Sequence, residues 1–240
     1  MTGMKVLCIG NSFSQDAASY LNRAAANQGI EIHTENLYIG GCSLERHYNN
    51  MISGDKAYEL EINGEETHIN VSLGESLEKE KWDVITVQQA SHFSAFYSTY
   101  QPYVSALVGF IREKQPEAKV FIHQTWAYEE NSQRLADNGF AARKEMFAEI
   151  GKCYRLAAEE CGADGLIPSG QVFENMAAKG IKCHRDTFHA SLGAGRYALA
   201  LTWIKALTGA DINGNTFNET SEPISADEAA KIKKSVNEAF

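Results

Sequence analysis

The segment that most constrains the fold is an apolar run from Lys5 to Ile9, which ends abruptly at Gly10-Asn11-Ser12. A short run of this kind is typical of a buried strand in a parallel sheet, and a helical pattern follows it. Side chains at such a strand-to-helix turn lie at the carboxyl edge of the sheet, where α/β proteins bind ligands. Ser12 is therefore well placed for a nucleophile. The alternative interpretation is that Ser12 or Ser14 only caps the following helix.

The rest of the chain also alternates between apolar runs and helical patterns, which predicts strand–helix units and a mainly parallel sheet of five strands. The predicted strands cover residues 5–9, 32–39, 84–87, 119–124 and 165–167. The predicted helices cover residues 17–28, 103–113, 141–161, 192–207 and about 226–239. Right-handed crossovers would place helices on both faces of the sheet and bring the loops after the strands to one edge.

An interruption of this alternation predicts a β-hairpin. Apolar and polar residues alternate on both sides of Asn63-Gly64, a favoured turn sequence, so residues 57–72 are expected to form a hairpin insertion beside the sheet. It could border the substrate cleft or mediate self-association. The stretch 209–223 contains many Asn and Thr residues and predicts an extended surface loop. No linker or repeat divides the chain, so residues 1–240 are expected to form a single domain.

Composition favours a compact enzyme and argues against several other classes. A chain of 240 residues with 44% hydrophobic content can bury one substantial core. Its net charge of −9 provides no electrostatic footprint for a nucleic acid or an anionic membrane as partner. Five cysteines without regular spacing predict reduced, packing thiols.

The N-terminus has no basic segment followed by a long apolar run, so we expect a cytoplasmic protein, although a trimmed signal peptide would leave the same sequence. A homo-oligomer is compatible with the sequence.

A second informative segment lies near the C-terminus, where Asp186 and His189 are three residues apart just before the predicted helix 192–207. A turn there can bring the carboxylate to one imidazole nitrogen and leave the other facing outward. This is the arrangement that activates a serine, because a free hydroxyl is barely nucleophilic at neutral pH. The order along the chain is Ser, Asp, His. Such chemistry needs no metal and no organic cofactor.

A metal site is the first alternative for this segment. Cys183, His184, Asp186 and His189 are all possible ligands. They are crowded into one short segment, however, and no second cluster completes a closed site.

These motifs resemble those of the SGNH, or GDSL-like, hydrolase superfamily, in a branch with Gly-Asn-Ser in place of the usual Gly-Asp-Ser. Ser12 matches the first block, Gly41 in Ile39-Gly40-Gly41-Cys42-Ser43-Leu44 matches the second, and Asp186 with His189 matches the last. The resemblance covers roughly residues 4–207. It implies a flavodoxin-like three-layer α/β/α sandwich with strand order 2-1-3-4-5. It also implies that the backbone amides of Ser12 and Gly41 hold an oxyanion.

The third block departs from the family pattern. Where the family has an asparagine after the third strand, this chain has Gln88-Gln89, so a glutamine amide would have to act as the side-chain oxyanion donor. Neighbouring side chains of a strand point to opposite faces, so we expect only one of the two to reach the site. Gln88 is favoured and Gln89 stays open.

The expected activity is a two-step acyl transfer in which an ester forms an acyl-enzyme on Ser12. Acetylated sugars are among the substrates of the family, and we expect an acetyl or other short acyl group on a carbohydrate or small-molecule ester. The candidate substrate-binding residues are Asn11, which also holds the turn, and three residues after the third and fourth strands: His92, His123 and Trp126.

Two other classes of function remain as alternatives. One is a non-catalytic carbohydrate-binding or interaction protein on a hydrolase scaffold, which the missing asparagine favours. The other is a flavodoxin-like nucleotide binder, which the lack of a glycine-rich phosphate loop disfavours.

Overall fold

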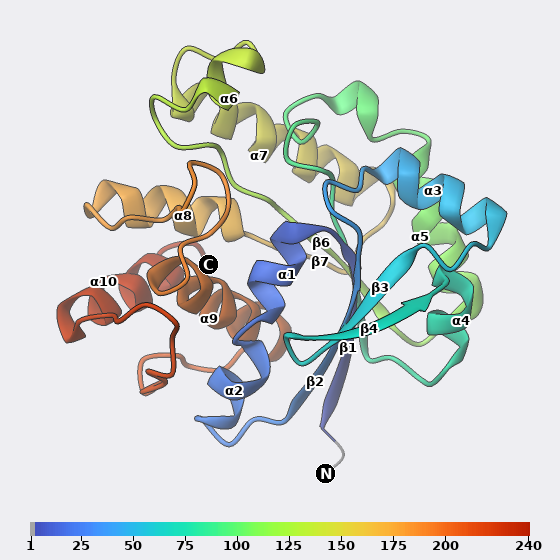
Figure 1. The fold of residues 1–240 in the computed structure, drawn as a ribbon, viewed down its shortest axis with the longest axis horizontal. Coiled ribbons are helices and arrows are strands. Elements are labelled where there is room, and N and C mark those ends of the chain that lie inside the picture. The colour runs from blue at the N-terminus through green and yellow to red at the C-terminus, as the bar shows by residue number, and fades with distance from the viewer. Residues whose placement is uncertain (1–2) are drawn as a thin grey trace.

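The computed structural model describes residues 3–240, and its centre is a single twisted sheet of seven strands (Figure 1). The strand order is β4-β3-β2-β1-β5-β6-β7. Five strands are parallel and correspond to the predicted order 2-1-3-4-5: β1 (Met4–Gly10), β2 (Ile32–Tyr38), β5 (Val84–Val87), β6 (Lys119–His123) and β7 (Gly165–Ile167). The other two are the antiparallel strands β3 (Tyr58–Ile62) and β4 (Glu65–Val71).

The hairpin corrects our prediction of a five-stranded sheet with an insertion beside it. Strand β3 pairs with β2 from Glu35–Ile62 to Tyr38–Glu59, so the hairpin extends the sheet. Without it, β2 would be an edge strand with open backbone groups. The turn Asn63-Gly64 has φ values of 52° and 87°, the positive values that a two-residue hairpin turn requires.

Helices cover both faces of the sheet, as predicted, and make a three-layer sandwich (Figure 1). One face carries α3 (Leu44–Ser53), α4 (Leu73–Glu78), α5 (Tyr103–Lys114) and α7 (Arg143–Glu160). The other carries α1 (Ser12–Ala18), α2 (Leu21–Ala26), α8 (Ser169–Ala178), α9 (Ala194–Thr208) and α10 (Ala226–Asn237). The short helix α6 (Gln133–Asp137) lies beyond the carboxyl ends of the parallel strands.

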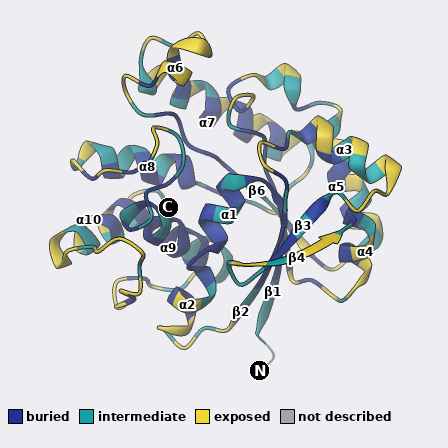
Figure 2. Ribbon diagram, in the orientation of Figure 1, coloured by how far each residue is buried: buried dark blue, intermediate teal, exposed yellow. Residues whose placement is uncertain are grey.

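The two cores follow directly from the alternation of side chains along the buried strands. Leu7 and Ile9 of β1 face the layer with α5 and α7, whereas Val6 and Cys8 face the layer with α1 and α9. Figure 2 shows the resulting burial, with dark elements at the centre. No helix among residues 3–240 is both long and apolar enough to cross a membrane.

The helix predicted at 17–28 differs most from the observed structure. It is two short helices, and the first begins at Ser12 rather than at residue 17. Four of the five residues from Ser12 to Asp16 are polar and give no apolar helical pattern, and the partners of Ser12, Gln15 and Asp16 lie far away in the sequence. Four helices were not predicted at all: α3, α4, α6 and α8.

Candidate active site

Ser12 is the first residue of α1, directly after the end of β1. Asn11 is the N-cap: its backbone is extended (φ −148°, ψ −156°) and its Oδ1 accepts a hydrogen bond from the amide of Phe13 at 3.0 Å. The interpretation of Ser12 or Ser14 as the cap is therefore wrong. A Cβ on Gly10 would lie only 2.4 Å from the Ser14 hydroxyl oxygen, so this turn requires glycine. The Ser12 hydroxyl is left available for other partners.

That hydroxyl is hydrogen-bonded to His189. The distance from Ser12 Oγ to His189 Nε2 is 2.8 Å, and His189 Nδ1 lies 2.7 Å from Asp186 Oδ2. Because an ionised carboxylate only accepts, Nδ1 carries the proton and Nε2 accepts from the serine. The structure thus brings together the three residues from opposite ends of the chain that the sequence singled out.

The turn around Asp186 is held by its own backbone. Asp186 Oδ1 accepts a hydrogen bond from the His189 amide at 2.8 Å. Partial desolvation of the carboxylate works to raise its pKa, but the hydrogen bonds from the side chain and backbone of His189 outweigh this, so the pKa of Asp186 lies below its ordinary value. The carboxylate stays charged opposite the imidazole.

The metal-site alternative is not supported by this geometry. Cys183 Sγ lies 3.6 Å from the carbonyl of Phe173, and His184 Nε2 donates to the carbonyl of Ala127 at 3.1 Å. Both side chains are buried and are bonded away from the Asp186–His189 pair. Within residues 3–240 these four side chains form no common ligand cluster.

Asp16 joins the two halves of the site, and the sequence analysis missed it. It lies one helical turn after Ser12 with 0% of its side chain exposed. Its carboxylate accepts from Arg185 Nη1 at 2.9 and 3.1 Å, from Arg196 Nε at 2.8 Å and from the amide of Ala190 at 3.0 Å. Arg185 and Ala190 flank the Asp186–His189 turn, so Asp16 fixes that turn to the helix that carries Ser12. An acidic residue in a helix gives no such signal, because its partners lie far away in the sequence.

Below Ser12, Asp186 and His189, a chain of buried hydrogen bonds crosses the carboxyl ends of all five parallel strands. Asn11 Nδ2 donates to the carbonyl of Cys42 at 3.0 Å, and Gln88 Nε2 donates to Asn11 Oδ1 at 2.7 Å. His123 Nδ1 donates to Gln88 Oε1 at 2.6 Å, and Ser169 Oγ donates to His123 Nε2 at 2.9 Å. We call these five residues the floor network. It holds the loops after the strands in one arrangement.

The floor network corrects three of our assignments. Asn11, Gln88 and His123 are all buried, and their side chains bond to one another rather than facing a substrate. Burial lowers the pKa of His123 to about 3, so its ring is neutral. The expectation that Asn11 holds the turn agrees with this arrangement. Asparagine suits the position because it both donates and accepts, which a carboxylate cannot do.

Gln89 is equally occupied. Its Oε1 accepts from the amide of Leu44 at 3.0 Å, and its Nε2 donates to the carbonyl of Thr99 at 2.9 Å. Both glutamine side chains are therefore buried and hydrogen-bonded to other parts of the scaffold. Gly41 lies in an exposed turn with φ +62°, next to Cys42, which bonds to Asn11. Within the described part of the chain, the amides of Ser12 and Gly41 make no backbone or side-chain hydrogen bond.

Trp126, which we predicted to bind the substrate, is part of the core. Trp126 is fully buried, stacks on Phe13 with ring centroids 4.1 Å apart and donates to the carbonyl of Phe188 at 2.8 Å. It therefore supports both α1 and the Asp186–His189 turn from below. Of the predicted substrate-binding residues, only His92 is exposed; it lies on the loop after β5.

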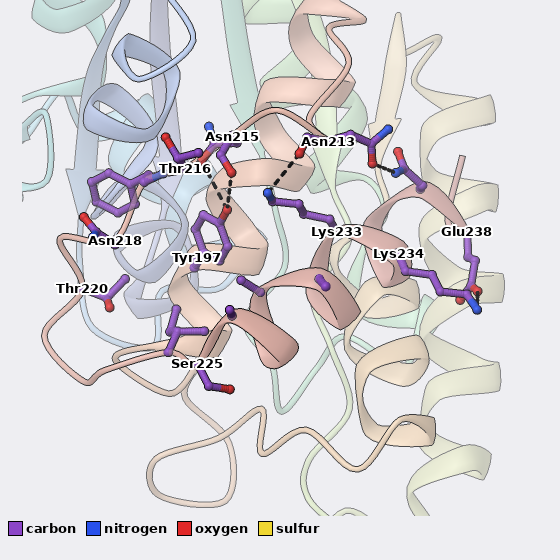
Figure 3. Close-up of a pocket in the computed structure, with 16 residues that line it drawn as sticks. Tyr197, Asn213, Asn215, Thr216, Asn218, Thr220, Ser225, Lys233, Lys234 and Glu238 are labelled. Atoms are coloured by element: carbon purple, nitrogen blue, oxygen red, sulfur yellow. Dashed lines mark hydrogen bonds and ion pairs between the residues drawn. The ribbon is translucent and has the colours of Figure 1, made fainter.

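A cavity of about 840 Å³ lies elsewhere, between α10 and the loop before it (Figure 3). Its lining includes Tyr197, Asn215 and Lys233, and Tyr197 points its hydroxyl at Asn215. None of Ser12, Asp186 and His189 lines it. The cavity therefore does not belong to the site described above.

Comparison with solved structures places the fold in a known class: it is an α/β fold that resembles SGNH hydrolases. A candidate SGNH hydrolase from Slackia heliotrinireducens is 21% identical, with a TM-score of 0.62, over 85% of this chain and 99% of that one. An acetylxylan esterase from Geobacillus stearothermophilus is 15% identical, with a TM-score of 0.55, over 85% of this chain and 93% of that one.

The chain itself belongs to the family described as a domain of unknown function, DUF4886, whose model matches residues 5–239. A crystal structure of a DUF4886 protein from Bacteroides uniformis is 35% identical, with a TM-score of 0.90, over 99% of this chain and 94% of that one. A comparison with curated proteins found no match.

Proposed function

We propose that this protein is a serine ester hydrolase of the SGNH type. The observation that carries the proposal is the hydrogen-bonded series from Ser12 through His189 to Asp186, with distances of 2.8 and 2.7 Å. The same constellation activates serine on several unrelated folds, because a base that takes the hydroxyl proton converts a weak nucleophile into a strong one.

In the first half-reaction, Ser12 Oγ attacks the ester carbonyl carbon while its proton moves to His189 Nε2. Asp186 stabilises the imidazolium that forms. The free amides of Ser12 and Gly41 are the candidate donors to the oxyanion, and losing one such donor typically costs about 3 kcal/mol. When the intermediate collapses, the bond to the alcohol oxygen breaks and His189 returns the proton to that oxygen.

In the second half-reaction, His189 removes a proton from water, and the resulting hydroxide attacks the acyl carbon. The bond to Ser12 Oγ breaks, the serine regains a proton from His189, and the carboxylic acid leaves. All the proton transfers use one imidazole whose other nitrogen is held by Asp186.

For the substrate, we propose a short acyl group, such as acetyl, on a carbohydrate or small alcohol. An acetylxylan esterase has the same fold, and this likeness in fold is the reason for proposing an acetyl ester. The exposed phenylalanines Phe93 and Phe96, 37% and 39% exposed, lie on the loop after β5 and could pack against a sugar ring.

The test is hydrolysis of p-nitrophenyl acetate and butyrate by the wild type, Ser12→Ala and His189→Ala. We expect both variants to lose at least about 10³-fold in kcat/KM with unchanged far-UV circular dichroism. Ser53→Ala, at an exposed position on α3, is the matched control and should keep full activity. Full activity in Ser12→Ala would exclude this serine as the nucleophile.

A non-catalytic binding protein is the second candidate, and the occupied amides of Gln88 and Gln89 favour it. In that case an acetylated sugar would bind equally well to the wild type and to Ser12→Ala, as measured by calorimetry, and neither protein would release acetate.

A further inference from the structure

Arg134 lies beside the turn from Asp186 to His189, which we call the catalytic turn, and it has no acidic partner among the described residues. The guanidinium carbon of Arg134 lies 4.0 Å from the centroid of the Phe188 ring, and that ring lies 3.8 Å from the imidazole of His189, centroid to centroid. Within residues 3–240, no carboxylate lies at ion-pair distance from Arg134, and its guanidinium donates no hydrogen bond. Of the seven other arginines, five pair with a carboxylate, namely Arg23, Arg112, Arg143, Arg185 and Arg196, whereas Arg46 and Arg155 have no such pair within the described residues.

The position of this arginine is set by the contact of its segment with the catalytic turn. The amide of Glu129 donates to the carbonyl of Thr187 at 2.8 Å, and Ser132 Oγ lies 2.9 Å from Thr187 Oγ1. Figure 1 shows α6, which carries Arg134, beyond the carboxyl ends of the parallel strands. Because the guanidinium lies over the face of Phe188, its N–H edges stay available for a planar anion.

The loop after β5 also approaches Arg134, because His92 of that loop feels its charge. His92 is exposed there, and partial burial together with the charge of Arg134 lowers its pKa, so it is neutral at pH 7. Phe96 of the same loop packs against Phe140, which follows α6, with ring centroids 6.1 Å apart. The side chains that Arg134 approaches most closely on this side, Phe188 and His92, are therefore neutral.

The direction of proton transfer says which part of a substrate reaches this region. His189 returns its proton to the leaving oxygen, so the alcohol part of an ester must lie against His189. Phe188 and Arg134 are the next side chains beyond it. We propose that Arg134 forms a subsite for a negatively charged group on the alcohol part, so that the substrates are acyl esters of acidic sugars, such as uronic acids. This inference rests on the proposed esterase function.

The overall charge of the protein makes a local cation necessary for binding an acidic substrate. The chain carries a net charge of −9, which repels anions at long range. That repulsion is screened over about 8 Å at physiological ionic strength, whereas a bidentate contact acts at hydrogen-bond distance. A local cation is therefore needed if an acidic substrate is to bind in a productive position.

The kinetic test uses two acetate esters with the same aromatic frame, 4-acetoxybenzoate and the neutral 4-acetoxybenzamide. For Arg134→Gln we expect kcat/KM to fall about tenfold for the carboxylate ester, mainly through KM, which corresponds to about 1.4 kcal/mol. The neutral ester should change less than about twofold, and Arg134→Lys should lie between. Arg112→Gln is the control: Arg112 pairs with Asp164, before the start of β7, at the opposite edge of the sheet.

Equal effects on both esters, or none on either, would overturn the subsite while leaving the esterase intact. A second arm does not depend on turnover: calorimetry of methyl glucuronide and methyl glucoside with Ser12→Ala, with and without Arg134→Gln. Preference for the glucuronide that disappears with Arg134→Gln supports the subsite even if no ester is hydrolysed. Equal binding of the two sugars, or binding of neither, contradicts it.

Discussion

Two layers of polar side chains lie at the carboxyl edge of the sheet, and they differ in almost every physical respect. The upper layer, Ser12, Asp186 and His189, is partly exposed, and 19% of the His189 side chain is accessible. The floor network below it is buried, and its polar side chains bond mainly to one another. Both layers use residue types that perform catalysis elsewhere. Burial and complete hydrogen bonding, rather than residue type, therefore distinguish the side chains that hold the scaffold from the side chains that are accessible to a ligand.

The lower layer is tolerated in a dry environment because its members satisfy each other. A buried amide without a partner costs about 1–3 kcal/mol, but a fully connected network rigidifies its surroundings. Asn11 belongs to the floor and precedes Ser12, so the floor also sets the position of Ser12.

The largest effect should come from the upper layer. Asp186→Asn should lower kcat on p-nitrophenyl acetate by about 10³–10⁴-fold, because an amide no longer holds the imidazole in the tautomer that accepts from Ser12. The melting temperature should stay within a few degrees, since this side chain is exposed. Activity within tenfold of the wild type would show that His189 needs no orienting carboxylate.

Substitution of Asp16, which links the two layers, should have the next largest effect. Asp16→Asn should cost about 3 kcal/mol in the free energy of unfolding, because it removes a fully buried charge and leaves the half-buried guanidinium groups of Arg185 and Arg196 without their counter-charge. It should also lower kcat more than it raises KM, since the His189 turn loosens. The control is Asp227→Asn, whose exposed pair with Lys231 should contribute less than about 0.5 kcal/mol in urea unfolding.

If Asp16→Asn does not fold, Asp16→Glu supplies the same test at constant charge. A variant of either kind with full stability and full kcat would contradict a positioning role for this carboxylate.

A substitution within the floor network should lower the stability of the fold more than it lowers the rate of ester hydrolysis. Asn11→Asp should destabilise the fold by about 2–3 kcal/mol at pH 7, because the carboxylate cannot donate to Cys42 and its charge is buried. The deficit should shrink near pH 4, where a protonated carboxyl can donate again. Asn218→Asp adds the same charge at an exposed position and should change stability by less than about 0.5 kcal/mol. Equal deficits in the two variants would mean that charge alone, and not the network, matters.

The smallest single-residue effect is the share of one buried histidine in a pH dependence of stability. Burial lowers the pKa of His47 and His123 to about 3 and that of His184 to about 4. Below about pH 6.5 the unfolded chain binds protons at these rings and the folded chain does not, so they lower stability as pH falls from about 6.5 to 4. Each histidine contributes up to about 1.4 kcal/mol per pH unit.

Urea unfolding at pH 7 and pH 5 measures this slope. His123→Gln should show a shallower loss than the wild type between the two pH values, whereas His68→Gln, at an exposed position, should show the same loss. Identical slopes for all three proteins would mean that His123 is protonated in the folded state.

The parallel part of the sheet was predictable to within one residue at each strand end. Strands β1, β5 and β6 are largely apolar runs, as strands buried on both faces usually are, whereas β2 buries the polar residues Thr34, Glu35 and Asn36. The attachment of the hairpin to β2 was not, since a hairpin pattern does not say which edge it will pair with. Short helices such as α4 and α8 were not predicted, because fewer than three turns give too few repeats to establish a helical period.

For the site, the sequence by itself determined which residues could react: a serine at a strand-to-helix turn and an aspartate three residues before a histidine. Tertiary structure decided which polar and aromatic side chains reach the surface. Gln88, His123 and Trp126 follow or end strands just as reactive residues do, yet burial turns them into supports. The role of Asp16 depends on its ion pairs with Arg185 and Arg196, which lie at the far end of the chain. Local patterns report chemistry, whereas burial and partners are properties of the folded chain.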